Sequence, residues 1–195
     1  MTRQATIKRR TAETDITLSL TIEGSGKADI STGIGFFDHM LTLFAKHSLI
    51  DLTVKTVGDI HVDFHHTVED TGIVLGQTLR EALGDKSGIV RYGSFHLPMD
   101  ETLSRVVIDL SGRPFLDYRG PSNVASIRQF SFTLVEEFLR GFANSLGANL
   151  HVEILYGRDA HHMSESVFKG LARALDAAMQ RDPRVIGIPS SKGQI

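Results

Sequence analysis

Two five-residue segments share a pattern of two adjacent histidines followed, after two other residues, by a glutamate: 65–69 (HHTVE) and 161–165 (HHMSE). Imidazole and carboxylate groups are ligands that proteins use for divalent transition metals. On a helix, residues three and four apart share a face, so each glutamate lies near both of its histidines. The adjacent histidines point about 100° apart around the helix axis, so they suit two ions better than one. The repeated pattern therefore predicts a two-metal site.

An internal repeat around these motifs indicates one further ligand in each half of the chain. The segment 38–41 (DHML) precedes the first motif at nearly the interval by which 136–139 (EEFL) precedes the second. His39, which alone would suit a structural or capping role, thereby matches Glu137 as a candidate ligand. The predicted ligands are His39, His65, His66, Glu69, Glu137, His161, His162 and Glu165. The chain has no cysteine, and ligation by nitrogen and oxygen alone fits Mn, Fe, Co or Zn.

The segment before the first motif carries Asp59, His61 and Asp63 at alternate positions. We expect this alternation to direct them toward the side of His65. They are either partners that orient the metal ligands or ordinary polar strand residues, and the pattern favours neither. The remaining histidines lack a partnering motif, and we expect them to be structural or solvent-facing.

A second group of residues has the chemistry needed to hold a phosphate monoester. Isolated basic residues lie beside turns at Arg91, Arg113 and Lys169. The segment 190–193 (SSKG) adds two serines, a lysine and a glycine. Small hydroxyls, glycine backbone and Arg or Lys side chains are common in phosphate sites. No segment matches a P-loop, and the lone GxG at 33–35 is a weak dinucleotide signal.

The hydrophobic pattern predicts the elements that position these groups. Apolar residues alternate in 16–20 and again in 106–110, as in half-buried strands. They recur at helical spacing in 37–44 and 134–142, and further strands at 52–54 and 150–154 lead to helices over 65–83 and 161–179. The chain is therefore predicted to be a duplicated α+β protein with two-layer half-domains and helices on one face of each sheet. We place the halves at residues 1–84 and 85–195, the latter including a substrate-binding tail.

Composition excludes several classes of protein. With 41% hydrophobic and 23% charged residues, the 195-residue chain is neither disordered nor fibrous. Its formal net charge of −2 argues against nucleic acid as a partner, and the basic run 8–10 reads as a solvated strand end. No segment is long and apolar enough for a membrane span, and residues 1–15 lack the apolar core of a secretory signal. We expect a cytoplasmic protein with neither nucleic acid nor membrane as a partner.

These motifs together resemble the imidazoleglycerol-phosphate dehydratase family over essentially the whole chain. The matching segments are 10–14 (RTAET), 35–41 (GFFDHML), 65–70 (HHTVED), 98–101 (PMDE), 111–114 (SGRP), 161–165 and 189–193 (PSSKG). The resemblance implies half-domains similar to the second domain of ribosomal protein S5, two Mn(II) ions per active site, and a homo-oligomer of twenty-four subunits with active sites between them. It also implies substrate contacts, the basic ones to phosphate, from Glu13, Arg91, Arg113, Lys169, Ser190 and Lys192. One departure is Glu137, because family members often have histidine there.

The implied reaction removes water from D-erythro-imidazoleglycerol phosphate to give imidazoleacetol phosphate in histidine biosynthesis. We expect the substrate ring to bind both metals as imidazolate and to expel the neighbouring hydroxyl, giving a diazafulvene-like intermediate whose next C–H is acidic. Glu13 is the candidate base or acid. The residues expected to take part in catalysis are Glu13, His39, His65, Glu69, His162 and Glu165.

Two other functions use parts of the same sequence. A metal-storage or metal-sensing cage would use the two histidine motifs but leaves the phosphate-type residues unexplained. An RNA-binding module rests on the S5-like fold alone, and the net charge of −2 opposes it.

Overall fold

The computed structural model describes residues 2–195, which form two four-stranded sheets and four helices. The first half contains β1 (Gln4–Arg10), β2 (Thr14–Thr21), β3 (Ala28–Ser31), α1 (Gly35–Ser48), β4 (Asp51–Gly58) and α2 (His65–Leu83). The second half contains β5 (Tyr92–Met99), β6 (Thr102–Asp109), β7 (Phe115–Arg119), α3 (Leu134–Leu146), β8 (Asn149–Tyr156) and α4 (Ala160–Met179). The order of elements is the same in both halves, so the predicted duplication is confirmed.

The two sheets have the same topology. Their strand orders are β1-β2-β4-β3 and β5-β6-β8-β7, and in each the third strand of the half pairs parallel with the fourth across a connecting helix. This crossover places α1 and α3 on one face of their sheets. The alternating Ile16, Leu18 and Leu20 of β2 are buried on that face. The predicted α+β fold, with helices on one face of each sheet, is confirmed.

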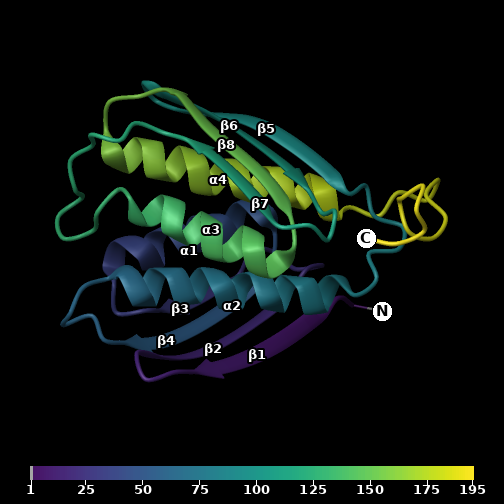
Figure 1. The fold of residues 1–195 in the computed structure, drawn as a ribbon, viewed down its shortest axis with the longest axis horizontal. Helices are drawn as coiled ribbons and strands as arrows, with labels where there is room; N and C mark the ends of the chain where they lie inside the picture. The colour runs from purple at the N-terminus through teal and green to yellow at the C-terminus, as the bar shows by residue number, and fades with distance from the viewer. Residues whose placement is uncertain (1) are drawn as a thin grey trace.

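All four helices lie between the two sheets, so the halves share one core (Figure 1). Helix α2 packs against α3, and α1 packs against α4. The contact of α2 with α3 is close because α2 carries glycines there: a Cβ on Gly72 would lie 2.6 Å from the carbonyl oxygen of Phe138, and one on Gly76 would lie 2.5 Å from that of Phe142. Stacked phenylalanine rings, such as Phe138 on Phe168 with centroids 4.9 Å apart, fill the space between the helices.

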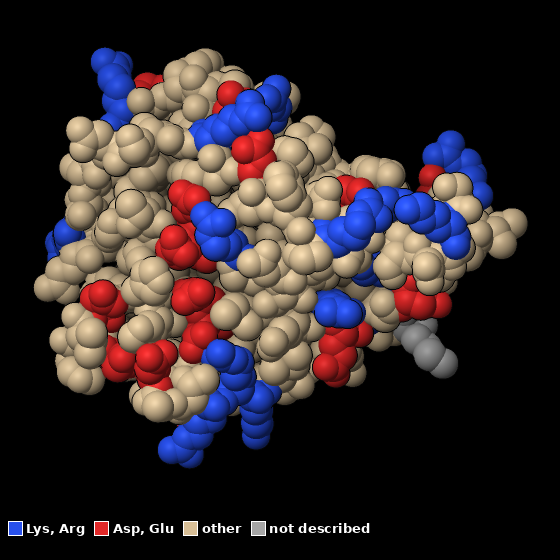
Figure 2. All heavy atoms as spheres, viewed as in Figure 1, with Lys and Arg blue, Asp and Glu red and all other residues tan. Residues whose placement is uncertain are grey.

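This arrangement puts both histidine motifs at one end of the molecule. Helices α2 and α4 both begin at the left of Figure 1 and end at the right, where the C-terminal tail lies. The predicted boundary between residues 84 and 85 falls in the connection from α2 to β5. None of the helices formed by residues 2–195 meets the length and hydropathy of a membrane span. On the face shown in Figure 2, basic and acidic side chains are interspersed, without a continuous basic stripe.

Candidate metal and substrate site

The second histidine motif forms a three-residue cluster with His39. His39 Nε2 lies 2.9 Å and His161 Nε2 lies 3.0 Å from the same carboxylate oxygen of Glu165. The cluster joins the two halves, because His39 belongs to α1 and the other two residues to the first turns of α4. Among residues 2–195, these three are the group whose ligand atoms come within 4.8 Å of one another. The internal repeat had predicted all three as ligands, and the structure brings them together.

The electrostatics of this cluster suit a metal ion. Lys169 Nζ donates to the second carboxylate oxygen of Glu165, whose side chain is only 9% exposed. Burial alone would raise the pKa of Glu165, but the hydrogen bonds from Lys169, His39 and His161 outweigh burial and lower this pKa to about 2. Glu165 is therefore ionised at neutral pH. An ionised carboxylate with two imidazoles is a donor set that fits a divalent transition metal.

The first histidine motif is more open. His65 Nε2 lies 3.7 Å from Glu69 Oε2, and His66 Nε2 lies 3.6 Å from Glu13 Oε1. Glu137 belongs to α3, which packs on α2 as α1 packs on α4, and it lies 3.9 Å from Arg140. Within the described chain, Glu137 does not form a close three-residue group with the first motif. Its ligand role stays a prediction.

The expectation that each glutamate lies near both of its histidines is wrong for the second histidine, which pairs with carboxylates outside its motif. Adjacent imidazoles lie 6.2 Å apart between ring centroids in both motifs, as the helical divergence predicted. His162 Nδ1 donates to Glu101 Oε2 over 2.7 Å, and His66 Nδ1 donates to Asp59 Oδ2 over 3.0 Å. These hydrogen bonds raise the pKa of both histidines above the usual value.

Glu101 had no role in the sequence prediction beyond its place in a family motif. The signal that could have found it is the repeat, because Glu13 precedes Thr14 in the first half as Glu101 precedes Thr102 in the second. Backbone hydrogen bonds, chiefly from Asp159, and then the bond from His162 hold the pKa of Glu101 well below its usual range.

The expected strand-like alternation of Asp59, His61 and Asp63 is wrong. Strand β4 ends at Gly58, and the chain then turns, with Val62 N donating to the carbonyl oxygen of Asp59. The turn is needed because the chain must leave the sheet to enter α2. Asp59 still contacts His66, and Asp63 Oδ1 accepts a hydrogen bond from the backbone N–H of His65 at the start of the helix.

The remaining histidines lie apart from both motifs. His96 and His151 are exposed, and His151 lies 3.5 Å from Asp117 on the second sheet. Partial burial lowers the pKa of His47, and the charges of Lys169 and Arg173 lower it further.

The predicted phosphate residues are divided between the two ends of the molecule. Lys169 lies beside Glu165, near the start of α4, whereas the backbone N–H of Arg91 donates to the carbonyl oxygen of Ala178 in the last turn of α4. Glu165 and Ala178 are 13 residues apart in α4, so these two contacts lie about 20 Å apart along the helix. A single small substrate cannot reach both ends of one chain.

At the tail end, Arg91 anchors the C-terminal segment. Its guanidinium donates twice to Asp109, at 2.7 and 3.1 Å, and once to the carbonyl oxygen of Pro189, at 2.8 Å. The loop that carries Arg113 lies beside the end of the tail, because a Cβ on Gly112 would lie 2.7 Å from the terminal carbon of Ile195. Arg113 and the C-terminal segment therefore lie close together. The guanidinium of Arg91 is already paired with Asp109.

The tail itself is a compact turn. Ser190 accepts hydrogen bonds from the backbone N–H groups of Lys192, at 3.2 Å, and Gly193, at 3.0 Å. The side chains of Arg113 and Lys192 are exposed to solvent. They are therefore free to bind an anion presented from outside the chain.

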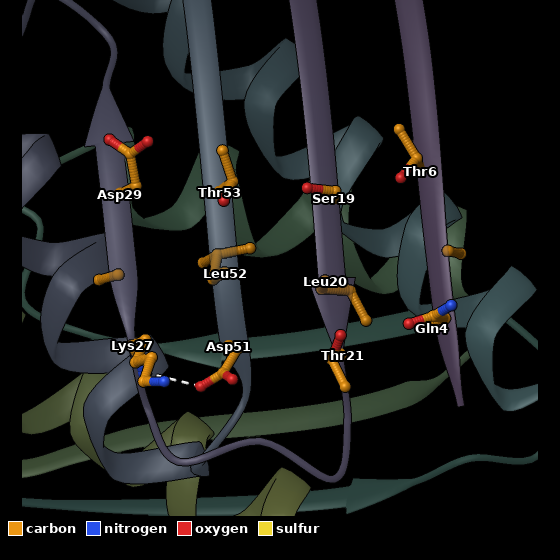
Figure 3. Close-up of a pocket in the computed structure, with 12 residues that line it drawn as sticks. Gln4, Thr6, Ser19, Leu20, Thr21, Lys27, Asp29, Asp51, Leu52 and Thr53 are labelled. Carbon is orange, nitrogen blue, oxygen red and sulfur yellow. Dashed lines mark hydrogen bonds between the residues drawn. The ribbon is translucent and has the colours of Figure 1, made fainter. Parts of the chain in front are cut away.

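Two large depressions lie on the surface. One, of about 670 Å³, lies beside the cluster of His39, His161 and Glu165, and its lining includes His161 and the apolar Phe36, Phe64 and Phe130. The other, of about 630 Å³, lies on the outer face of the first sheet (Figure 3). Its hydroxyl and amide side chains point outward. The carboxylate of Asp51 accepts a hydrogen bond from the backbone N–H of Lys27. Of these two depressions, the first adjoins the cluster of His39, His161 and Glu165.

Comparisons with known proteins agree with this architecture. Residues 32–175 match the family model described as imidazoleglycerol-phosphate dehydratase. Proteins of that name from Methylorubrum extorquens and Methylorubrum populi are 59% and 60% identical over 194 residues, covering 99% of this chain and 100% of each relative. A solved imidazoleglycerol-phosphate dehydratase from Staphylococcus aureus superposes with a TM-score of 0.83 at 38% identity, covering 92% of this chain and 99% of that one. The structure of the enzyme from Pyrococcus furiosus in complex with (S)-C348 gives 0.84 at 36% identity, covering 97% and 100%. This chain belongs to the imidazoleglycerol-phosphate dehydratase family.

Proposed function

We propose that this chain dehydrates D-erythro-imidazoleglycerol phosphate to imidazoleacetol phosphate in histidine biosynthesis, with a site that holds two metal ions. The observation that carries the proposal is the convergence of His39, His161 and Glu165 from both halves of the chain. Family membership supports the reaction, and this cluster supports the part of the proposal that concerns metal.

The predicted ligands fit a pair of Mn(II) ions. His39, His161 and Glu165 would hold one ion, and the other predicted ligands, His65, His66, Glu69, Glu137 and His162, would contribute to the rest of the pair. The same nitrogen and oxygen donors would also accept Fe, Co or Zn. When bound, the ions would hold the substrate ring as imidazolate and supply positive charge for the electron density that develops in the reaction.

Glu13 is the residue we propose to move the substrate proton. Its carboxylate is half exposed and lies beside His66, so from its place just before β2 it can reach a substrate bound beside the first histidine motif. The proton moves from carbon to a Glu13 carboxylate oxygen, and the electron pair of that C–H bond forms a carbon–carbon double bond. The hydroxyl on the carbon next to the ring leaves and takes up the proton held by Glu13, which gives water and restores the Glu13 carboxylate. The resulting enol tautomerises to the ketone.

Replacing Glu13 by Gln is expected to lower kcat by about 10²–10⁴-fold, the usual contribution of general acid–base catalysis. The metal content should not change, because Glu13 is not among the predicted ligands. Steady-state kinetics and metal analysis of the purified variant would measure both quantities. A matched control is Asp15→Asn, which changes an exposed carboxylate two residues further on, in β2. If Glu13→Gln turns over substrate as fast as the wild type, Glu13 is not the base.

We further propose that two chains complete each site, in a homo-oligomer of twenty-four subunits. The separation of the tail end from the metal end supports this proposal, since a substrate that contacts metal and Arg113 at once needs these groups from different chains. In this arrangement Ser190, Lys192 and Arg113 of one subunit hold the phosphate, with Arg91 keeping the tail in place. Glu13 and Lys169 of the other subunit contact the rest of the substrate.

The double variant Arg113→Ala/Lys192→Ala is expected to raise KM and to lower kcat/KM by at least about 10–100-fold, because each charge-assisted hydrogen bond contributes about 1.5–3 kcal/mol. Its kcat at saturating substrate should change much less. Steady-state kinetics at substrate concentrations on both sides of KM would measure the split. An unchanged KM would remove both residues from the phosphate site.

The same variant tests whether a site is shared between chains. When it is unfolded and reassembled at equal amounts with a Glu165→Gln variant, about a quarter of the sites receive an intact metal end and an intact tail end. At low substrate concentration, the mixture should then recover about a quarter of the wild-type rate. A rate no higher than the mean of the two separate variants would contradict a site shared by two chains.

A further inference from the structure

We propose that Asp59 and Glu101 are positioning residues that set the tautomer of His66 and His162, and that the two halves of the duplication supply this carboxylate from different positions. The inference rests on the proposed metal site. It concerns carboxylates that lie outside the predicted ligand set.

Glu101 holds His162 in a defined geometry. Its Oε1 accepts backbone hydrogen bonds from Asp159, at 3.0 Å, and Arg158, at 3.3 Å, while its Oε2 faces His162 Nδ1 at 2.7 Å. An ionised carboxylate can only accept hydrogen bonds, so Nδ1 must carry the proton. The lone pair of the neutral ring is then on Nε2, the atom left to bind a metal. Carboxylate partners of this kind commonly orient metal-binding histidines.

Asp59 does the same for His66. Its Oδ2 faces His66 Nδ1 at 3.0 Å, and its side chain is 20% exposed. The other oxygen, Oδ1, is buried and has no hydrogen-bond partner among the described residues. The side chain is therefore held by its contact with His66, and again Nε2 is the free ring nitrogen.

The two halves reach this result through different positions. Glu13 and Glu101 precede equivalent central strands, β2 and β6, yet only Glu101 bonds to a histidine Nδ1. In the first half Asp59 provides that bond. Glu13 therefore stays 3.6 Å from His66 Nε2 with a side chain that is 52% exposed.

The residues that follow β4 and β8 explain the difference. Gly58 and Gly157 lie opposite the equivalent threonines Thr14 and Thr102: Gly58 is the strand partner of Thr14, and a Cβ on Gly157 would lie 2.6 Å from Thr102 Oγ1. The next residue is Asp59 in the first half and Arg158 in the second. An arginine cannot accept a hydrogen bond from a histidine.

The second connection offers no other carboxylate for the role. It is shorter, 157–159 against 59–64, and Asp159 accepts the backbone N–H of His162 as the helix cap at 3.0 Å. Glu101 is thus committed to His162 Nδ1. The carboxylate beside His162 Nε2 is that of Asp100, 3.7 Å away, just as Glu13 lies 3.6 Å from His66 Nε2.

The variant Glu101→Gln tests the proposal with little change of shape. Its amide oxygen can keep the backbone hydrogen bonds of the connection, while its NH₂ group must donate to His162 Nδ1 and so moves the ring proton to Nε2. We expect Mn(II) to bind about 10–100-fold more weakly, as is usual when a partner of a metal ligand is lost. Asp59→Ala should weaken binding to a similar extent. Matched controls are Glu153→Ala and Asp29→Ala, which remove carboxylates that are ion-paired on the sheets.

Two readouts on the full-length chain separate the possible outcomes. Electron paramagnetic resonance titration gives the affinity for Mn(II), and magic-angle-spinning NMR of histidine-labelled, metal-free protein gives the tautomers. The proposal expects Nδ1–H at His66 and His162 in the wild type and a reversed tautomer at His162 in Glu101→Gln. Wild-type Mn(II) affinity in both variants, or Nε2–H at these histidines in the wild type, would overturn it. Failure of the wild type to bind Mn(II) would instead contradict the proposed function, while the tautomers would still decide this inference.

Discussion

The Glu165→Gln variant is expected to lose Mn(II) at the clustered site and to lower the rate of dehydration by about 10³-fold, near the upper range for loss of one electrostatic contribution to catalysis. Glu165 is the carboxylate on which His39, His161 and Lys169 converge, and its pKa of about 2 keeps it ionised at neutral pH. A neutral amide lacks the charge that balances the cation. It also leaves Lys169, whose side chain is 16% exposed, without its counter-ion.

Metal content and kcat measured on the same preparation would check this expectation. The control is Glu153→Gln, which alters a carboxylate of β8 that is paired with Arg105. A melting temperature close to that of the wild type would show that the fold is kept. If Glu165→Gln retains wild-type metal content and wild-type kcat, the cluster is not the metal site.

Most of the fold could be predicted because each element carries its own periodicity. The apolar pattern of 65–83 matches α2 at both ends, and 161–179 differs from α4 by one residue at its start. The duplication added the pairing of equivalent elements. The duplication could not predict that the helices pack between the two sheets. This packing depends on contacts such as that of Gly72 with Phe138, which no local sequence pattern encodes.

The candidate site was predictable in its residue types more than in its arrangement. The repeat identified His39 as a candidate ligand, and the structure places it on Glu165. The strand-like arrangement expected for Asp59, His61 and Asp63 was wrong, because alternate polar residues occur in exposed turns as well as in strands. The partnership of Glu101 with His162 joins residues far apart in the sequence, so only the folded chain reveals it.

The division of the substrate residues between two ends also required the structure. In the sequence, Arg91 and Lys169 are simply two basic residues beside turns. Their separation follows from the length of α4 and from the contact of Arg91 with its last turn. Because of that separation, we propose that each site takes residues from two chains.

Removal of the metal is expected to have the other very large effect. Without metal, Glu165 is bonded to His39, His161 and Lys169. These groups alone offer the substrate ring no metal ion to bind. Chelation should therefore stop the dehydration while the core, which is built from helices and sheets away from the cluster, stays folded.

The most direct test is to assay the purified protein for dehydration of imidazoleglycerol phosphate after complete removal of metal and again after addition of Mn(II). The account predicts no turnover by the stripped protein and recovery of activity with added Mn(II), with Mg(II) serving as a control ion that prefers oxygen ligands. Undiminished turnover by metal-free protein would contradict the metal-dependent site. Absence of turnover under every condition would contradict the proposed dehydratase activity itself.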